Sequence, residues 1–295
     1  MHIACQKPGG EIAAPAEPDA RPAPATVAVP VSRFSAATIA TTLVRLGVVA
    51  AISARTIARW LRADKLKPWR FRSWITPKDL ATFLERACPV LDLYERVATG
   101  TLAAGEVVFS VDEKTSIQAR AHATYTPTGR DEPAHIEHTY KRCGAVHLIA
   151  ALNVRSGEIA GAVVADKRFV EFSAFLRDLL TTALQQGARR IHLILDNGST
   201  HRPKYLAQWV AESFPGVAVE LHWLPVRSSW LNQVEIFFGI LQQHALTPND
   251  FPGTDAVTHR ILAFIAYRNQ NARPIAWTYT SRQLRAKHER LQLAA

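Results

Sequence analysis

Residues 191–201 read Ile-His-Leu-Ile-Leu-Asp-Asn-Gly-Ser-Thr-His. An apolar run ends at Asp196, and the turn-forming residues Asn197 to Thr200 follow it. A short apolar run that stops at turn formers predicts a buried strand. A carboxylate at the C-terminal end of such a strand, followed by a loop and a helix, lies where open α/β sheets bind ligands. Asp-Asn-Gly is also an ordinary turn sequence, so this stretch alone leaves a ligand site and a simple turn equally open.

The composition of the whole chain indicates a globular protein with a polyanionic partner. The 295 residues are 48% hydrophobic and 20% charged, which is enough apolar material for one large domain with an accessory one, or for two modest domains. The net charge is +10 and the sequence pI is about 9.8. A charge of this size and sign favours nucleic acid as the first partner to consider.

Cysteine usage and hydropathy indicate in which part of the cell the protein is expected. Cys5, Cys88 and Cys143 lie far apart and form no C-x-x-C pair, which argues against a disulfide framework or a zinc-finger grid. The sequence contains no apolar run of membrane-spanning length and no signal peptide pattern. We therefore expect a cytoplasmic protein that has no membrane partner.

Residues 32–76 predict a small helical module. Ser35 and Ser53 are each placed to cap a short helix, and Gly47 is suited to end the first one. The second helix is expected to turn three apolar residues inward: Ile57, Trp60 and Leu61.

The same module is strongly basic. Residues 32–75 carry nine Lys or Arg against one acid, Asp64. Two short helices joined by a tight turn, the second rich in arginine, are typical of a helix-turn-helix that contacts DNA phosphates and grooves. A solvated basic hairpin that only packs against the rest of the chain is the alternative. The residues expected to bind DNA are Arg55, Thr56, Arg59, Arg62, Lys65, Lys67, Arg70 and Arg72.

The order of the later elements predicts the fold class. Strands are expected at 107–111, 117–125, 145–154, 159–164, 191–195 and 217–224, and helices at 169–186, 204–213, 229–244 and 256–269. This order predicts an α/β fold with a mixed sheet and helices on both faces, which is the order of the ribonuclease-H-like fold. The expected parts are a disordered Pro/Ala-rich leader (1–31), the helix-turn-helix module (32–76), a connecting helix with a break at Pro89 (77–104), the catalytic domain (105–285) and a tail (286–295).

Three acids are expected to meet at one edge of this sheet. Asp112 and Asp196 each follow an apolar strand, and in this topology the two strands are central neighbours. Glu235 lies at the border of the apolar stripe formed by Trp230, Val234, Phe237, Phe238 and Leu241. Grouped carboxylates raise each other's pKa, and a hard divalent cation removes the conflict. The predicted cofactor is Mg²⁺ or Mn²⁺, as two ions about 4 Å apart that support in-line displacement at a phosphodiester.

Three sequence blocks carry a family resemblance. V-D-E-K at 111–114, L-D-N-G-S-T-H at 195–201 and S-S-W-L-N-Q-V-E at 228–235 resemble bacterial insertion-sequence transposases of the mariner-like superfamily, whose catalytic acids give them the label DDE. By this resemblance Asp112 and Asp196 would hold the metal between them and Glu235 would complete the site. Six further positions match as supporting groups: Lys114, Asn197, His201, Trp230, Asn232 and Gln233.

The resemblance also implies a reaction and its partners. Members of the family hydrolyse a phosphodiester at each element end and then use the freed 3′-hydroxyl to attack target DNA, typically at a TA dinucleotide. The implied partners are double-stranded DNA, as terminal inverted repeats and as target, and a second copy of the chain in a homodimer.

Other functions stay open at this point. A non-catalytic, repressor-like derivative of a transposase would need the basic module but not the three acids. A general ribonuclease-H-like nuclease would cut DNA that lacks inverted repeats. The spacing of His135, His138 and Cys143, with Glu137 nearby, suggests zinc only weakly because a fourth ligand is missing.

Overall fold

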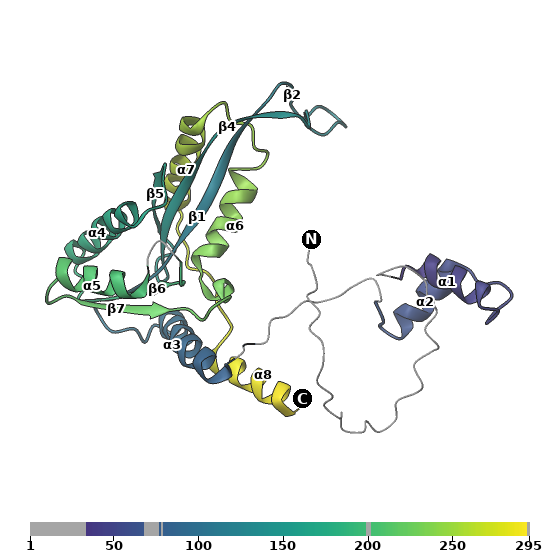
Figure 1. Ribbon diagram of the computed structural model, residues 1–295, viewed down its shortest axis with the longest axis horizontal. Helices are drawn as coiled ribbons and strands as arrows, with labels where there is room; N and C mark the ends of the chain where they lie inside the picture. The colour runs from purple at the N-terminus through teal and green to yellow at the C-terminus, as the bar shows by residue number, and fades with distance from the viewer. Residues whose placement is uncertain (1–33, 68–76, 78, 199–201, 294–295) are drawn as a thin grey trace, which may run out of the picture. The chain divides into compact units, whose positions relative to one another are not determined.

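The computed structural model describes residues 34–67, 77, 79–198 and 202–293 (Figure 1). The chain divides into two compact units, Met1–Thr76 and Pro77–Ala295. Within the described ranges, no helix combines the length and the apolar character needed to cross a membrane.

The first unit contains two short helices, α1 (Ala36–Arg45) and α2 (Ala54–Ala63). Their N-termini are capped as the sequence predicts, because the hydroxyls of Ser35 and Ser53 each accept a backbone N–H bond over 3.1 Å, from Thr38 and Thr56. Trp60 is 50% exposed, so the expectation that it faces inward is wrong. Two short helices bury only a narrow stripe, and here that stripe is centred on Ala40 and Ile57.

The second unit is built on a five-stranded mixed sheet in the order β5-β4-β1-β6-β7. The strands are β1 (Glu106–His122), β4 (Tyr140–Asn153), β5 (Ile159–Val164), β6 (Arg190–Leu195) and β7 (Ala218–Trp223). β1 is central: it runs antiparallel to β4 on one side and parallel to β6 on the other. β6 and β7 are also parallel. Because β1 and β6 pair directly, the strands expected to carry Asp112 and Asp196 do lie side by side.

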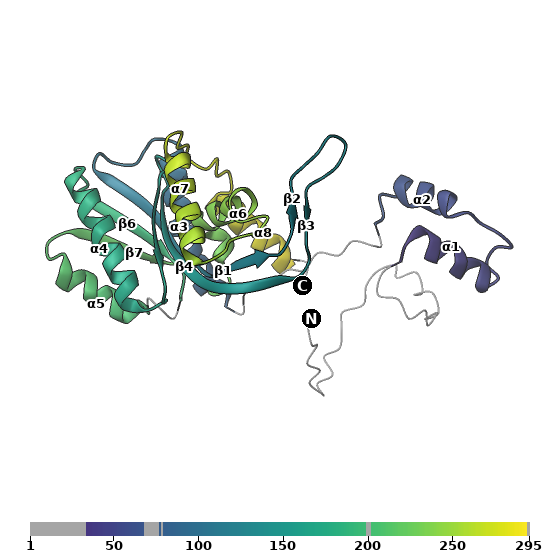
Figure 2. The same ribbon diagram turned by 90° about the horizontal axis from the view of Figure 1, so that it is seen from above.

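The two strands predicted at 107–111 and 117–125 are one continuous strand, β1. Its ladder with β4 shifts between Lys114 and Ile117, where Ser116 has a φ of 56°. This irregularity bends the strand without ending it, which explains why the sequence pattern breaks there. β1 and β4 then continue beyond the other strands towards a small hairpin of β2 (Tyr125–Thr126) and β3 (His135–Ile136) (Figure 2).

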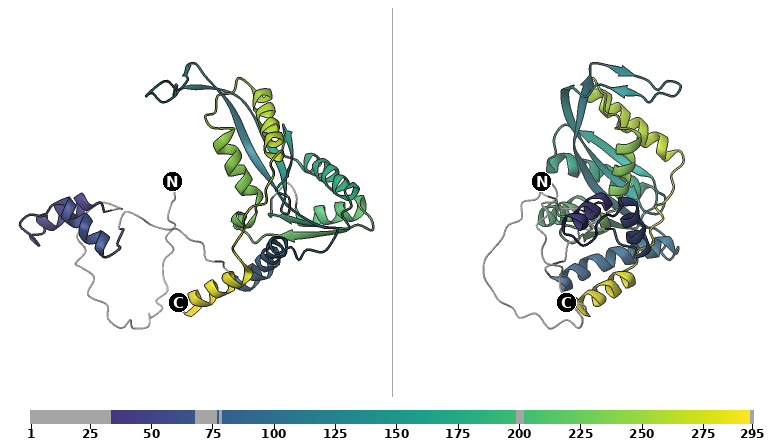
Figure 3. Two further views of the ribbon diagram at one scale, coloured as in Figure 1. Left: turned by 180° about the vertical axis from the view of Figure 1, so that it is seen from behind. Right: turned by 90° about the vertical axis from the view of Figure 1, so that its right-hand side faces the viewer.

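Helices cover both faces of the sheet (Figures 1 and 3). Helices α4 (Phe169–Gln185) and α5 (Pro203–Ser213) pack on the face that Ile191, Leu193 and Leu195 of β6 share. The opposite face, which carries Ile194 of β6 and Val108 of β1, is covered by α3 (Leu80–Ala98), α6 (Val234–His244), α7 (Thr254–Asn269) and α8 (Ser281–Leu293). The candidate site lies on this second face.

Three helical segments differ from the sequence expectation. α3 runs through Pro89, because the residues around it are fully buried and their packing outweighs the lost hydrogen bond. The helix expected at 229–244 is a short 3₁₀ turn, η1 (Ser229–Leu231), followed by α6. α8 crosses the expected boundary at 285/286 and packs on α3, which itself contributes to a core shared with β1 and β6.

Candidate active site

Strand register places Asp112 level with Asp196. The last β1–β6 pair is Ser110 with Ile194, and Asp112 and Asp196 each follow two residues later. Because side chains alternate along a strand, both acids lie on the α6 side of the sheet. β6 ends at Leu195, so β1 has no strand partner on that side beyond Ser110 and the edge is open beside Asp112. The sequence predicts that Asp112 follows the end of a strand, and this prediction is wrong, because Asp112 lies in the middle of β1.

Asp112 is buried, at 7% exposure, and its carboxylate is held at both oxygens. Oδ1 accepts the backbone N–H of Glu113 over 2.7 Å, and Oδ2 accepts the side-chain amide of Asn232 over 3.1 Å. Burial raises the pKa of Asp112 to about 7, and the charges of Asp196, Glu235 and Glu113 add to the rise, while the bond from Glu113 N–H opposes it. The ionised form of the Asp112 carboxylate is therefore destabilised in this site.

Glu235 lies in the first turn of α6, above the same edge. Much of the residue is exposed, yet partial burial of its carboxyl raises its pKa. The Lys114 ammonium lowers that pKa and the charge of Asp196 raises it. The charge of Asp196 thus acts on both Asp112 and Glu235, so the three predicted acids lie near one another.

A buried polar network supports Asp112 from below. The amide oxygen of Asn232 accepts the hydroxyl of Ser110, and that hydroxyl oxygen accepts the backbone N–H of Val234 over 3.0 Å. Asn232 Nδ2 also donates to the backbone oxygen of Val111 over 3.0 Å. The start of α6 is therefore attached to the centre of β1. Ser110 is a site residue that the sequence analysis missed, although a lone serine inside V-V-F-S-V is a signal for it.

Gln233 and Trp230 flank this network differently. Gln233 is completely buried, and neither atom of its amide has a hydrogen-bond partner among the described residues. Trp230 is 49% exposed, so the expectation that it is buried with the apolar stripe of α6 is wrong. Its ring meets the Tyr279 ring edge-on, with 5.8 Å between the two ring centroids. Trp230 belongs to η1, which precedes α6, and it is not part of the core cluster that contains Val234 and Phe237.

The residues after Asp196 hold the exit of β6. Asp196 Oδ1 accepts the backbone N–H of Gly198 over 2.9 Å. Asn197 Nδ2 donates to the backbone oxygen of Leu224 over 2.6 Å, which connects this exit to the end of β7. Its Oδ1 accepts a bond from Arg86 of α3 over 3.4 Å. His201 lies outside the described residues.

The basic residues predicted to bind DNA are exposed where the structure describes them. Arg55, Arg59 and Arg62 extend from α2, and Lys65 and Lys67 follow it. Thr56 is half-buried, and its hydroxyl lies 3.0 Å from that of Ser53 at the helix cap, so it serves the helix start as well. Arg70 and Arg72 lie outside the described residues.

The described residues contain one group of three metal-binding side chains whose ligand atoms all lie within 4.8 Å of one another, and it is His192, Glu220 and His222. The three acids are not gathered that tightly, and neither are His135, His138 and Cys143. The carboxylate site nevertheless offers only oxygen donors, and burial followed by neighbouring negative charge raises the pKa of Asp112 and of Glu235. Such a donor set suits Mg²⁺ or Mn²⁺.

Comparisons with known proteins agree with this geometry. The family model described as a DDE superfamily endonuclease matches residues 107–258, a range that contains Asp112, Asp196 and Glu235. No curated protein sequence matches the chain. Two solved structures have a similar fold, the Mos1 transposase paired-end complex with the left transposon end and a pre-cleavage Mos1 transpososome. Each is 15% identical, with a TM-score of 0.50, and the match covers 79% of this chain and 67% of the other. The expected ribonuclease-H-like fold class is confirmed.

Proposed function

The chain belongs to the DDE superfamily of endonucleases, and on this premise we propose that it is a transposase that cuts DNA at the ends of its element and joins the freed ends to target DNA. The observation that carries the proposal is the register of β1 and β6, which brings Asp112 and Asp196 level on one face beneath Glu235. The motif resemblance to mariner-like transposases and the fold shared with Mos1 transposase support it.

Asp112, Asp196 and Glu235 are proposed to hold Mg²⁺ or Mn²⁺, as two ions in the reacting complex. The fit rests on the chemistry of the donor set: the charge of Asp196 disfavours the ionisation of both Asp112 and Glu235, and a divalent cation bound by the three carboxylates would remove that conflict. When bound, such ions activate the attacking oxygen and stabilise the leaving oxygen of an in-line phosphodiester displacement.

The remaining site residues are proposed to orient these acids or the DNA. Asn232 holds Asp112 and the start of α6 in one arrangement through its buried hydrogen bonds. Asn197 fixes the backbone beside Asp196. The Lys114 ammonium opposes the rise in the pKa of Glu235 and so favours its ionised form. The exposed Trp230 ring is available to the DNA. Gln233 and His201 are proposed as further supporting groups by their motif positions.

The DNA partners are proposed to be the terminal inverted repeats and a target site, which by resemblance is a TA dinucleotide. Arg55, Arg59, Arg62, Lys65 and Lys67, together with Arg70 and Arg72, would neutralise phosphates of the repeat. Joining two ends to one target requires two active sites, so we propose a homodimer in the reaction. A protein acting on chromosomal DNA would work in the bacterial cytoplasm at the nucleoid.

The test is strand cleavage by the full chain on a duplex that carries the inverted repeat, with Mn²⁺ or Mg²⁺. We expect nicking, and we expect Asp112→Asn, Asp196→Asn and Glu235→Gln each to reduce its rate by at least about 100-fold. Substituting a residue that only orients a metal ligand already lowers metal affinity or activity by about 10–100-fold. The exposed acid Asp178 of α4 lies on the other face of the sheet, and Asp178→Asn is the matched control that should cut normally.

The same experiment separates the alternatives. Binding of the repeat without nicking, unchanged by Asp196→Asn, would identify a non-catalytic DNA-binding protein. Equal cleavage of matched and scrambled ends would identify a general nuclease. Either result overturns the proposal.

A further inference from the structure

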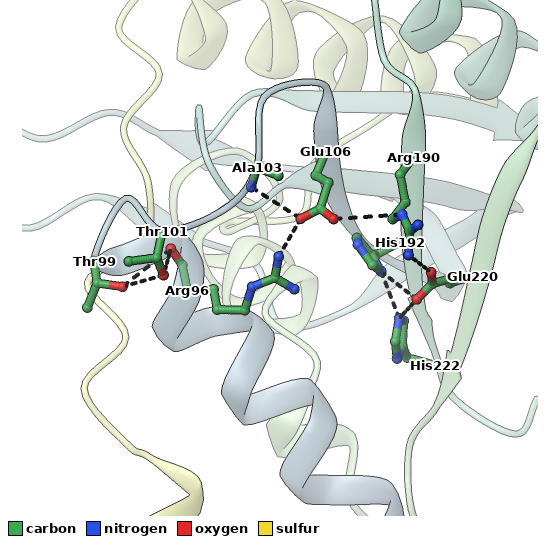
Figure 4. Close-up of polar contacts among 9 residues, drawn as sticks. All are labelled: Arg96, Thr99, Thr101, Ala103, Glu106, Arg190, His192, Glu220 and His222. Atoms are coloured by element: carbon green, nitrogen blue, oxygen red, sulfur yellow. Dashed lines mark hydrogen bonds and ion pairs between the residues drawn. The ribbon is translucent and has the colours of Figure 1, made fainter.

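Three metal-binding side chains converge outside the carboxylate site, between β6 and the edge strand β7 (Figure 4). His192 of β6 pairs in register with Glu220 of β7, and His222 follows two residues later. Since side chains two residues apart share a face, all three point to the same side of the sheet. His192 precedes Asp196 by four residues, which places the cluster about 13 Å from the carboxylate site along the strand.

The spacing of the ligand atoms fits a single small cation. His192 Nδ1 lies 3.0 Å from His222 Nε2 and 3.3 Å from Glu220 Oε2, and the last two atoms are 3.9 Å apart. Tetrahedral Zn²⁺ holds nitrogen and oxygen ligands at about 2.0–2.1 Å, which separates neighbouring ligand atoms by about 3.4 Å. The three observed distances bracket that value.

Hydrogen bonding alone satisfies this cluster poorly. Two facing N–H groups would clash over 3.0 Å, so at most one proton lies among three atoms that all carry lone pairs. His192 is buried, so water does not supply the missing donors on its side of the cluster, and a cation bound by all three atoms removes the deficit. His192 Nε2 is also buried and has no partner among the described residues, so the polar contacts of this ring are all made through Nδ1.

Neighbouring charges orient the carboxylate of the cluster. Arg190 NH1 donates to Glu220 Oε1 over 2.6 Å, and this leaves Oε2 directed at the two imidazoles. Arg190 and Arg96 both contact Glu106, so the positive charges beside the cluster are themselves paired (Figure 4). Hydrogen-bonded carboxylate ligands of this kind are usual around protein metal sites.

We propose that His192, Glu220 and His222 bind a zinc ion that joins the edge strand β7 to β6. Two imidazoles and one carboxylate favour Zn²⁺ over Mg²⁺, in contrast to the all-oxygen carboxylate site. The fourth position is left to water, and the Glu220 side chain, 41% exposed, gives the ion a path from solvent. The site is independent of the proposed transposition, because it uses none of the three acids.

The experiment titrates Zn²⁺ into the full-length, chelator-treated chain by calorimetry, with excess Mg²⁺ present to occupy oxygen-ligand sites. Substitution with Co²⁺ reports the coordination through its visible spectrum, and thermal denaturation reports stabilisation. Glu220→Gln and His222→Gln each remove one ligand. The matched controls are His259→Gln, which removes an exposed histidine of α7, His138→Gln, and Asp196→Asn in the carboxylate site.

We expect one equivalent of Zn²⁺ to bind the parent chain and raise its Tm. Affinity should fall at least about 100-fold in Glu220→Gln and His222→Gln, and the Tm increase should vanish, while the three controls behave as the parent. Glu220 is half-exposed, so Glu220→Gln keeps the test valid if His222→Gln fails to fold. Unchanged zinc binding in Glu220→Gln, loss of binding in His138→Gln or Asp196→Asn, or no binding by the parent overturns the proposal.

Discussion

Asn232 and Asp112 are 120 residues apart in the sequence and hydrogen-bonded in the fold, Nδ2 to Oδ2 over 3.1 Å. The same amide group donates to Val111 and accepts from Ser110, so its orientation is defined on three sides. Both side chains are buried. Asn232 is therefore a positioning residue, which acts on the candidate site by holding Asp112.

Asn232→Ala should weaken both the site and the fold. We expect Mn²⁺ affinity and DNA nicking to fall by about 10–100-fold, the usual effect of losing a residue that orients a metal ligand. The free energy of unfolding should fall by about 1–3 kcal/mol, because the Ser110 hydroxyl and the Val111 carbonyl lose a partner in the interior. Electron paramagnetic resonance of Mn²⁺, nicking rates and urea denaturation measure the three effects.

The matched control is Asn249→Ala. Asn249 bonds the other end of β1, accepting from Arg120 N over 3.1 Å and donating to Gln118 O over 2.8 Å. This variant should lose stability and keep its Mn²⁺ affinity. If both variants lose Mn²⁺ affinity alike, Asn232 has no orienting role beyond stability.

The raised pKa of Asp112 predicts a pH-dependent stability in the metal-free protein. Its ordinary pKa of 3.8 becomes about 7 in the fold. Well below its ordinary pKa the carboxyl is protonated in both states and costs nothing, and the cost grows from about pH 4 until the pH passes about 7. Between these limits the parent should lose on the order of 4 kcal/mol relative to Asp112→Asn.

Urea denaturation of both proteins in EDTA, at about pH 4 and about pH 8, measures this difference. Comparing the two pH values cancels the hydrogen bonds that the substitution itself changes. A stability difference that is constant across this range would show that Asp112 titrates normally. Added Mn²⁺ should restore the parent's stability at the higher pH, because ligand binding favours the folded state.

Gln233→Leu should stabilise the isolated protein and impair its activity. The buried amide of Gln233 has no partner among the described residues, and removing such a group is worth about 1–3 kcal/mol. The motif position of Gln233 predicts a supporting role in the reaction, and the completely buried amide can play that role only if the start of α6 moves when DNA binds, so we expect nicking to slow as stability rises. Thermal denaturation and nicking rates decide the matter, and an equally active stabilised variant would assign Gln233 no role in the reaction.

Arg59→Ala should weaken DNA binding without affecting Mn²⁺ binding. Arg59 is exposed on α2, and losing one phosphate contact lowers the slope of log K against log salt by about 0.9. Fluorescence anisotropy across a salt series measures affinity and slope together. Arg155→Ala, an exposed arginine between β4 and β5, is the control. An unchanged slope in Arg59→Ala would mean that α2 does not contact DNA.

Several helices, strands and turns of this protein could be predicted from the sequence, because each depends mainly on residues that are close together in the chain. Ser35 and Ser53 cap their helices as expected, since a cap depends on three or four neighbouring residues. Strand β6 and the turn at Asn197 were predicted for the same reason. Where an element depends on distant packing, prediction failed: α3 continues through Pro89 because buried neighbours hold it, and β1 continues through the irregularity at Ser116 because β4 pairs with both sides.

The candidate site shows the same distinction between features that the sequence predicts and features that depend on tertiary packing. Sequence motifs and strand order were sufficient to predict that Asp112, Asp196 and Glu235 share one edge of a ribonuclease-H-like sheet. Only the tertiary structure decided that Asp112 lies mid-strand at near-neutral pKa, that Ser110 and Asn232 support it, and that His192 meets Glu220 and His222. Those relationships depend on register between segments that are distant in the chain. A shift of one residue would turn each of these side chains to the other face, and no local pattern specifies that choice.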